Sequence, residues 1–128
     1  MRLLLDTHAF IWWDSDPAKL SPRALAMCQD RENELIVSVA SAWEMQIIRQ
    51  LGKLTLAVPL SDIIANQQRT NQIDILPVTL AHVLAIDALP QHHRDPFDRL
   101  LVAQATTENA SLVTNDPALA RYPVTIIW

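Results

Sequence analysis

The sequence predicts an α/β sandwich, in which helices cover both faces of a short parallel sheet. Short aliphatic runs alternate along the chain with longer segments whose apolar residues recur at helical spacing. With 128 residues, 50% of them hydrophobic, the chain is long enough for one domain with a substantial core and too short for two. It contains no repeat, low-complexity tract or linker, so residues 1–128 are expected to form a single domain.

The first expected strand covers residues 2–6, a continuous aliphatic run that ends in a carboxylate. A helical stretch follows over residues 8–13. The dipeptide Ser21-Pro22 combines an N-cap with proline at the first helical position, so a helix is predicted from there toward Arg31. Residues 35–37 form the second buried strand.

The middle of the chain is predicted to be mainly helical. One helix covers residues 39–51, and Gly52 stands just past its end, where a residue in the left-handed conformation is most often needed. Pro59 and Ser61 start the next helix, which runs toward Asn71.

The remaining elements follow from caps and apolar runs. Residues 73–76 form a short strand or an extended connector, and Thr79 caps a helix that Pro90 ends. Asp95-Pro96 opens a longer helix with apolar residues at helical spacing. Further strands are expected over residues 112–114 and 124–127, separated by a short helix that Asp116-Pro117 starts.

Two features of the composition exclude classes of function. The single glycine cannot provide the glycine-rich loop of P-loop or dinucleotide-binding proteins, so ATP, GTP or NAD binding by those routes is excluded. Fourteen acidic against ten basic residues give a formal charge of −4. By itself this charge argues against a protein that holds nucleic acid mainly through general attraction to phosphates.

The composition also favours a protein of the cytoplasm. The only cysteine, Cys28, cannot form an intrachain disulfide or a multi-thiolate zinc site, and it is expected to be a small packed residue. The aliphatic residues 3–5 are interrupted at once by Asp6, which leaves no signal-peptide core and no membrane-spanning run. No membrane association is expected.

Four acidic residues lie just after expected strands or in the first turns of helices, where open α/β sheets bind their ligands: Asp6, Glu44, Asp98 and Asp116. Glu44 is the most informative, because it heads an apolar stripe that continues to Leu51 and is expected to face the core. A carboxylate in that position needs a cation, a hydrogen-bond network or a raised pKa. A shared ion held by oxygens alone would be Mg²⁺ or Mn²⁺ rather than zinc.

Some acidic residues also have a purely structural interpretation. Asp116 before Pro117 has the position of an N-cap, and Asp95 and Asp98 have the spacing of an acidic capping box in which Asp95 is the cap. Asp6 has no evident basic partner nearby in the sequence, so a structural role explains it less well.

Histidine, tryptophan and arginine residues give weaker indications. The four histidines lack the paired spacing of a zinc helix, and His92-His93 have the character of a solvated loop. The four tryptophans are expected to be core or interface anchors, although Trp12 or Trp13, close to Asp6, could stack a nucleobase. Arg94 and Arg99 are either ion-pair partners or phosphate contacts.

Four segments, in order and together spanning nearly the whole chain, carry a resemblance to a known family. They are LLLDTHAFIWW, SVASAWEMQIIRQLGKL, HHRDPFDRLLVAQA and LVTNDPAL. The chain resembles PIN-domain proteins, and within that group the VapC-type toxins of prokaryotic toxin–antitoxin pairs. The resemblance implies a three-layer α/β/α sandwich and a metal-dependent ribonuclease, often a homodimer, that a partner antitoxin silences.

Carried over residue by residue, the family's four catalytic and metal-binding acids fall on Asp6, Glu44, Asp98 and Asp116. Thr7 and Thr114 fall on small hydroxyl positions beside the first and fourth acids, where they look like groups that support the ligands. The implied reaction is hydrolysis of an RNA phosphodiester with one or two Mg²⁺ or Mn²⁺ ions and water as the nucleophile. Two such ions would cancel the charge of the four acids, so the charge of the chain no longer argues against RNA.

Other functions are compatible with parts of the pattern. A metal-dependent phosphatase with an aspartyl nucleophile needs a second Asp two residues after Asp6, where this chain has His8. A receiver domain needs a lysine at a late strand end, and the only lysines are Lys19 and Lys53. A DNA nuclease would use the same acids, and a non-catalytic PIN-like interaction module would keep the fold while its acids only cap helices.

Overall fold

The computed structural model describes residues 1–91 and 94–128, and it confirms the α/β sandwich. The loop predicted at His92-His93 lies outside the described residues. Five parallel strands form one sheet in the order β3-β2-β1-β4-β5. The strands are β1 (Arg2–Leu5), β2 (Glu34–Ser38), β3 (Asp74–Leu76), β4 (Ser111–Val113) and β5 (Ile126–Ile127). Residues 73–76 therefore contribute a strand and not only a connector.

The strands alternate with helices along the chain. The α-helices are α1 (Thr7–Ser15), α2 (Pro22–Gln29), α3 (Val39–Gln50), α4 (Leu60–Asn71), α5 (Leu80–Ala85) and α6 (Pro96–Thr107). Short 3-10 helices are η1 (Pro17–Lys19), η2 (Ile86–Ala88) and η3 (Pro117–Arg121). Within residues 1–91 and 94–128, no helix has the length and apolar character needed to cross a membrane.

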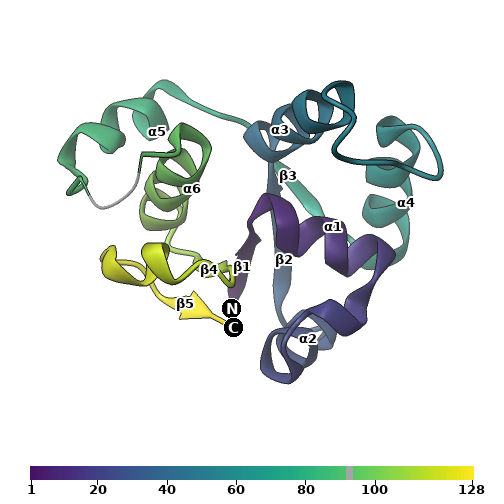
Figure 1. Ribbon diagram of the computed structural model, residues 1–128. Helices are drawn as coiled ribbons and strands as arrows, with labels where there is room; N and C mark the ends of the chain where they lie inside the picture. Colours follow the sequence, from purple (N-terminus) through teal and green to yellow (C-terminus); the bar gives the residue numbers. More distant parts are fainter. Residues whose placement is uncertain (92–93) are drawn as a thin grey trace.

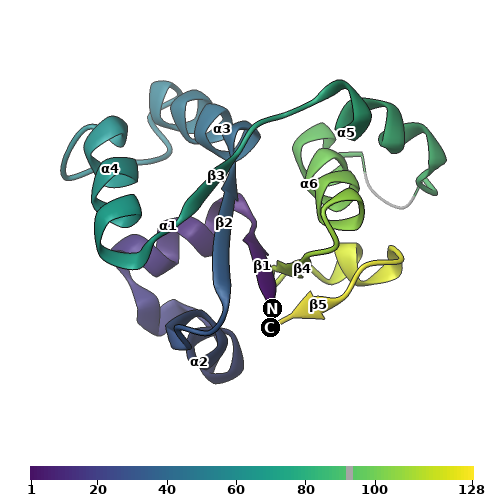
Figure 2. The ribbon, with the colours of Figure 1, turned by 180° about the vertical axis from the view of Figure 1, so that it is seen from behind.

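Helices lie on both sides of the sheet and give the three expected layers. α1, α2 and α4 cover one face, whereas α5, α6 and η3 lie on the opposite side (Figures 1 and 2). The chain moves outward from β1 to β2 and β3, and then returns to the other side of β1 for β4 and β5. The strand order thus reverses beside β1, and such a reversal leaves a crevice at the carboxyl ends of the neighbouring strands.

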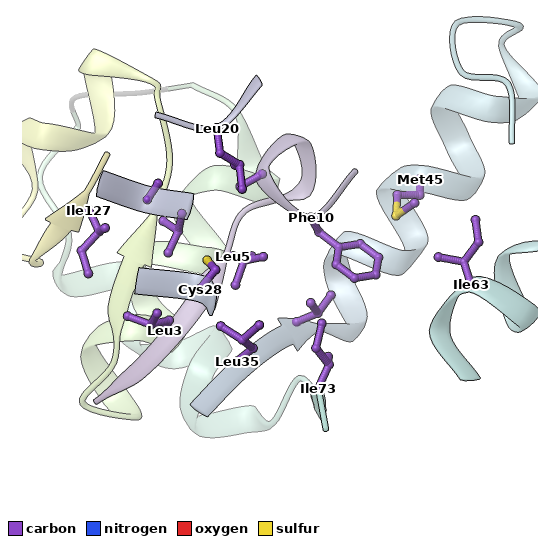
Figure 3. Close-up of a cluster of buried hydrophobic side chains, with 14 of the residues drawn as sticks. Leu3, Leu5, Phe10, Leu20, Cys28, Leu35, Met45, Ile63, Ile73 and Ile127 are labelled. Atoms are coloured by element: carbon purple, nitrogen blue, oxygen red, sulfur yellow. The ribbon is translucent and has the colours of Figure 1, made fainter. Parts of the chain in front are cut away.

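Alternation of side chains along β1 divides the core into two clusters. Leu3 and Leu5 join the cluster under α1, α2 and α4, which also holds Phe10 and Cys28 (Figure 3). Leu4 points to the opposite face and packs in the cluster under α6. Burial raises the pKa of the Cys28 thiol to about 11. Cys28 is therefore a packed and unreactive residue, as expected.

The predicted core-facing stripe of α3 is wrong in its position. Leu51 is 64% exposed, and the buried residues of this helix are instead Ala40, Ser41 and Met45. Each residue of an α-helix is turned by about 100° from its neighbour, so burying Met45 moves Glu44 to the edge of the buried face. Glu44 is half-buried there rather than enclosed in the core.

Two predicted helices differ from the structure in length or type. The helix capped by Thr79 ends at Ala85 and continues only as η2, so it stops before Pro90; such tightening of a last turn is common. Asp116-Pro117 does start a helix, but η3 is of the 3-10 type. Pro123 follows closely and lacks a backbone donor, which leaves no room for a longer helix.

A buried histidine that no sequence pattern singled out ties α5 to α6. His82 is 1% exposed; its Nδ1 accepts from the Thr79 backbone N–H at 3.0 Å, and its Nε2 lies 2.9 Å from a carboxylate oxygen of Glu108. The hydrogen bond from His82 holds the pKa of Glu108 below its usual range, and Arg2 adds a charge contact at 3.6 Å. The network thereby connects both helices to the start of β1.

Gly52 provides a test of local backbone strain. Its φ of +74° confirms the left-handed position after α3, and a Cβ at Gly52 would meet no atom within 4 Å. Backbone strain is therefore the main cost of Gly52→Ala, and we expect the free energy of unfolding to fall by about 1 kcal/mol. A urea unfolding curve measures this change, and it should show a lower midpoint at an unchanged m value. Gly52→Asn should lose less, and an alanine variant as stable as the parent would contradict this account.

Candidate functional site

The four acidic residues predicted from the strand ends line one cavity of about 450 Å³. We call it the acidic cavity; its lining residues are Asp6, Thr7, His8, Glu44, Asp95, Asp98, Asn115, Asp116 and Pro117. Its lining residues Asp6, Thr7 and His8 place the acidic cavity at the carboxyl end of β1, beside the strand reversal. Figure 1 shows β1 running into α1. Its volume is in the range of ligand-binding sites in proteins.

Asp6 and Asp116 are held by the helices that follow them. Asp6 directly follows β1, is 7% exposed, and accepts a hydrogen bond on Oδ1 from the backbone N–H of Ala9 at 2.8 Å. Asp116 follows β4 and accepts from the N–H of Ala118 at 2.9 Å. Both carboxylates are therefore N-caps, which confirms the N-cap position predicted for Asp116. Capping and lining the cavity are compatible, because a carboxylate has two oxygens.

Thr114 connects these two acids. Its side chain hydrogen-bonds the carboxylate of Asp6, and its Oγ1 accepts from the Asp116 backbone N–H at 3.1 Å. Burial raises the pKa of Asp6, while the hydrogen bonds from Thr114 and Ala9 oppose that rise. Burial outweighs these hydrogen bonds, so a nearby cation would stabilise the ionised form of Asp6.

Glu44 reaches the same cavity from α3. The hydroxyl of Thr7 donates to Glu44 Oε1 at 2.5 Å, so Thr7 supports Glu44 across 37 residues of sequence and not the adjacent acid, Asp6. Burial raises the pKa of Glu44; the Thr7 hydrogen bond lowers it, and the negative charge of Asp95 raises it further. The cavity thus holds a second carboxyl group whose charge is costly in the absence of a cation.

The start of α6 brings the remaining acids to the cavity. Asp95 Oδ1 accepts from the backbone N–H groups of Phe97 at 2.8 Å and Asp98 at 3.3 Å, which confirms Asp95 as a cap. Asp98 lies in the first turn and lines the cavity. Arg99 turns away from it, toward the backbone carbonyl of Ile86 at 3.5 Å.

The donor set of this cavity fits a hard divalent cation. Within the described part of the chain, no three His, Cys, Asp or Glu side chains stand close enough together to form a ready metal cluster. Like charges repel at short range, and the capping hydrogen bonds hold Asp6, Asp95 and Asp116 at their own helices. Mg²⁺ needs only one or two carboxylates directly, because it keeps several of its own waters. The acidic cavity meets that requirement with oxygen ligands alone.

Four lining residues were not among the site residues predicted from the sequence: His8, Asp95, Asn115 and Pro117. Asp95 and Pro117 were predicted only as parts of helix starts. His8 stands two residues after Asp6 but lacks a partner at zinc spacing; it is exposed and lines the cavity. Asn115 lies between Thr114 and Asp116. Its place directly after a predicted strand is the signal that could have found it.

Comparisons with known proteins agree with this architecture. A PIN domain family model matches residues 3–124. Ribonuclease VapC22 from Mycobacterium tuberculosis is 30% identical over 129 residues, which covers 97% of this chain and 97% of that protein.

Solved structures show the same fold. A chain of VapBC2 from Rickettsia felis, crystallised with a DNA fragment from the promoter, matches with a TM-score of 0.71 and 16% identity over 98% of this chain and 97% of that one. DNA-bound VapBC from Salmonella typhimurium gives a TM-score of 0.65 and 16% identity over 98% and 96% of the two chains. With the family model and the sequence relative, these findings show that the chain belongs to the PIN-domain family and is of the VapC type.

Proposed function

We propose that this protein is a Mg²⁺- or Mn²⁺-dependent endoribonuclease and the toxin of a toxin–antitoxin pair. The observation that carries the proposal is the meeting of Asp6, Glu44, Asp98 and Asp116, from four distant parts of the chain, around one cavity. Its support in sequence is the identity to a protein named as a ribonuclease. A phosphodiester is the substrate class that a carboxylate-held cation suits best.

In this proposal each acid has a distinct role. Asp6 and Asp98 are the principal metal ligands, Glu44 is a ligand or positions a bound water, and Asp116 holds a second ion or acts through water. Thr114 orients Asp6 and favours its ionised form through a hydrogen bond, and Thr7 does the same for Glu44. Bound Mg²⁺ or Mn²⁺ would supply Lewis-acid activation of an attacking water and neutralise charge on the phosphodiester.

The proposal includes two protein partners and a cytoplasmic location. An antitoxin is proposed because the structural relatives come from VapBC complexes. A homodimer is proposed because large apolar side chains are exposed on the two helices beside α6. The exposed fractions are 64% for Trp43 on α3, and 72% for Leu80 and 64% for Leu84 on α5.

The first test of this function is cleavage of RNA by protein freed of any antitoxin. We expect cleavage with Mg²⁺ or Mn²⁺ and none with EDTA, and we expect Asp6→Asn and Asp98→Asn to lower kcat/KM by about 100-fold or more. Asparagine at position 6 still offers an oxygen to the Ala9 N–H, so the helix cap survives the change.

Asp62→Asn is the matched control, because Asp62 is an exposed acid in the first turn of α4, outside the acidic cavity. Asp62→Asn should cleave RNA as the parent does, and its expression should arrest growth. Asp6→Asn and Asp98→Asn should cleave RNA poorly, and their expression should not arrest growth. Full activity of Asp6→Asn and Asp98→Asn would show that these two carboxylates take no part in cleavage. Cleavage of DNA but not RNA would replace the substrate in the proposal.

The second test measures metal binding without catalysis. Mn²⁺ at about 100 times its Kd should stabilise the folded parent protein by about 2.7 kcal/mol and raise Tm, because only the folded state brings the carboxylates together. Asp6→Asn and Asp98→Asn should show a much smaller rise, and Asp62→Asn the full one. An unchanged Tm of the parent with saturating Mn²⁺ would count against metal binding whatever the activity assay shows.

A further inference from the structure

Three aromatic rings extend from the acidic cavity along α1. His8 is exposed and lines the cavity, and its ring centroid lies 6.0 Å from that of Trp12, one helical turn further on. Trp12 in turn lies 5.8 Å from Trp128, with the ring planes tilted by 54°. Both tryptophans are only partly buried. We call these three side chains the aromatic row.

Strand register explains how Trp128 comes to this place from the other end of the sequence. Ile127 pairs with Val113 across β5 and β4, and Val113 pairs with Leu5 across β4 and β1. Trp128 therefore follows β5 at the level where Asp6 follows β1. The aromatic row and the acidic cavity occupy the same edge of the sheet.

The neighbouring Trp13 has a different environment. Its indole N–H donates to Gln67 Oε1 on α4 at 3.0 Å, so this side chain anchors one helix to another. Trp12 instead contacts rings on both sides, one of them at the cavity. Trp12, Trp13 and Trp128 all pack partly on the core. Of the two tryptophans that follow Asp6, Trp12 is the one whose ring lies beside a residue that lines the cavity.

The net charge of the protein gives a reason for an aromatic surface that could bind RNA. Two bound divalent ions would bring the net charge from −4 to about zero, so away from the acidic cavity the chain still offers an RNA strand little general attraction for its phosphates. Affinity must then come from contacts that do not depend on phosphate charge. Stacking of bases on aromatic side chains provides contacts of this kind and tolerates any base sequence.

We propose that the aromatic row binds unpaired nucleobases of the RNA strand and thereby places the adjoining phosphodiester in the acidic cavity. This inference rests on the proposed function and adds which side chains meet the bases of the RNA. His8, Trp12 and Trp128 are positioning residues in it. Bases within an RNA duplex are already stacked and paired, so a duplex does not offer its bases to the row.

The test is a titration of the full chain with a short single-stranded uridine oligonucleotide, with Ca²⁺ replacing Mg²⁺ to prevent cleavage. We expect the RNA to quench tryptophan fluorescence with a shallow dependence on salt. Trp128→Leu should weaken binding by about 10-fold, raise KM to a similar extent and leave kcat nearly unchanged. Trp13→Phe, on the same helix but outside the row, is the matched control and should bind as the parent does. The same oligonucleotide annealed to its complement should quench much less.

A second variant guards against a folding defect, because Trp128 also packs on the core. His8→Ala, at the exposed end of the row, should raise KM, and His8→Phe should restore it because it restores a flat ring. Quenching and KM that are unchanged in Trp128→Leu and in His8→Ala would overturn the inference. If the protein cleaves RNA with metal but quenching and KM are unchanged in both variants, only the role of the aromatic row is rejected. If quenching by RNA depends on Trp128 but no cleavage is found, only the nuclease proposal is rejected.

Discussion

Hydrogen bonds from helix N-terminal amides to carboxylates are the interactions on which the acidic cavity depends. Asp6, Asp95 and Asp116 each accept such a bond from the first turn of the helix that follows. The partial positive charge at a helix N-terminus favours a negative neighbour, and so it offsets part of the repulsion among these acids. Without this support, burial and mutual repulsion would drive the carboxyl groups to bind protons or to turn outward. The fold thus holds these carboxylates in place around the acidic cavity.

The position of β1 gives this arrangement its rigidity. β1 pairs with β2 on one side and β4 on the other, and Leu3, Leu4 and Leu5 are all fully buried between the two core clusters. Asp6 is the next residue, so its backbone is fixed by both layers of helices. Because Thr114 follows β4 in the same register, it reaches Asp6 without any long-range rearrangement. Attachment to rigid elements of this kind holds a side chain in a precise position.

Much of this could be predicted from the sequence, because the controlling signals are local. Caps at Ser21, Thr79 and Asp95, and aliphatic runs such as residues 35–37, depend on a few adjacent residues, and the structure has elements at each of them. The convergence of the acids on one cavity followed from a general property of parallel sheets, since each acid was expected at a strand or helix end.

The contacts that could not be predicted are those that depend on how the layers are packed. Thr7 donates to Glu44, which is distant in the sequence, and only the approach of α1 to α3 brings them together. Which face of α3 is buried depends on the fit of Met45 into the core, because several apolar residues on that helix could have faced inward. Leu51 is exposed because it follows the helix as its C-cap. His82 is buried for the same kind of reason, by a carboxylate that arrives from the end of α6.

The short edge strands of the sheet limit how this protein can associate with other chains. β3 and β5 are the outer strands, and they span only Asp74–Leu76 and Ile126–Ile127. Edges this short give an incoming strand few backbone groups to pair with, which protects the chain from edge-to-edge aggregation. Recognition by β-strand addition is disfavoured for the same reason. Association with another chain therefore has to use side chains on the helices, so its specificity is encoded in helical surface residues and can change without disturbing the sheet.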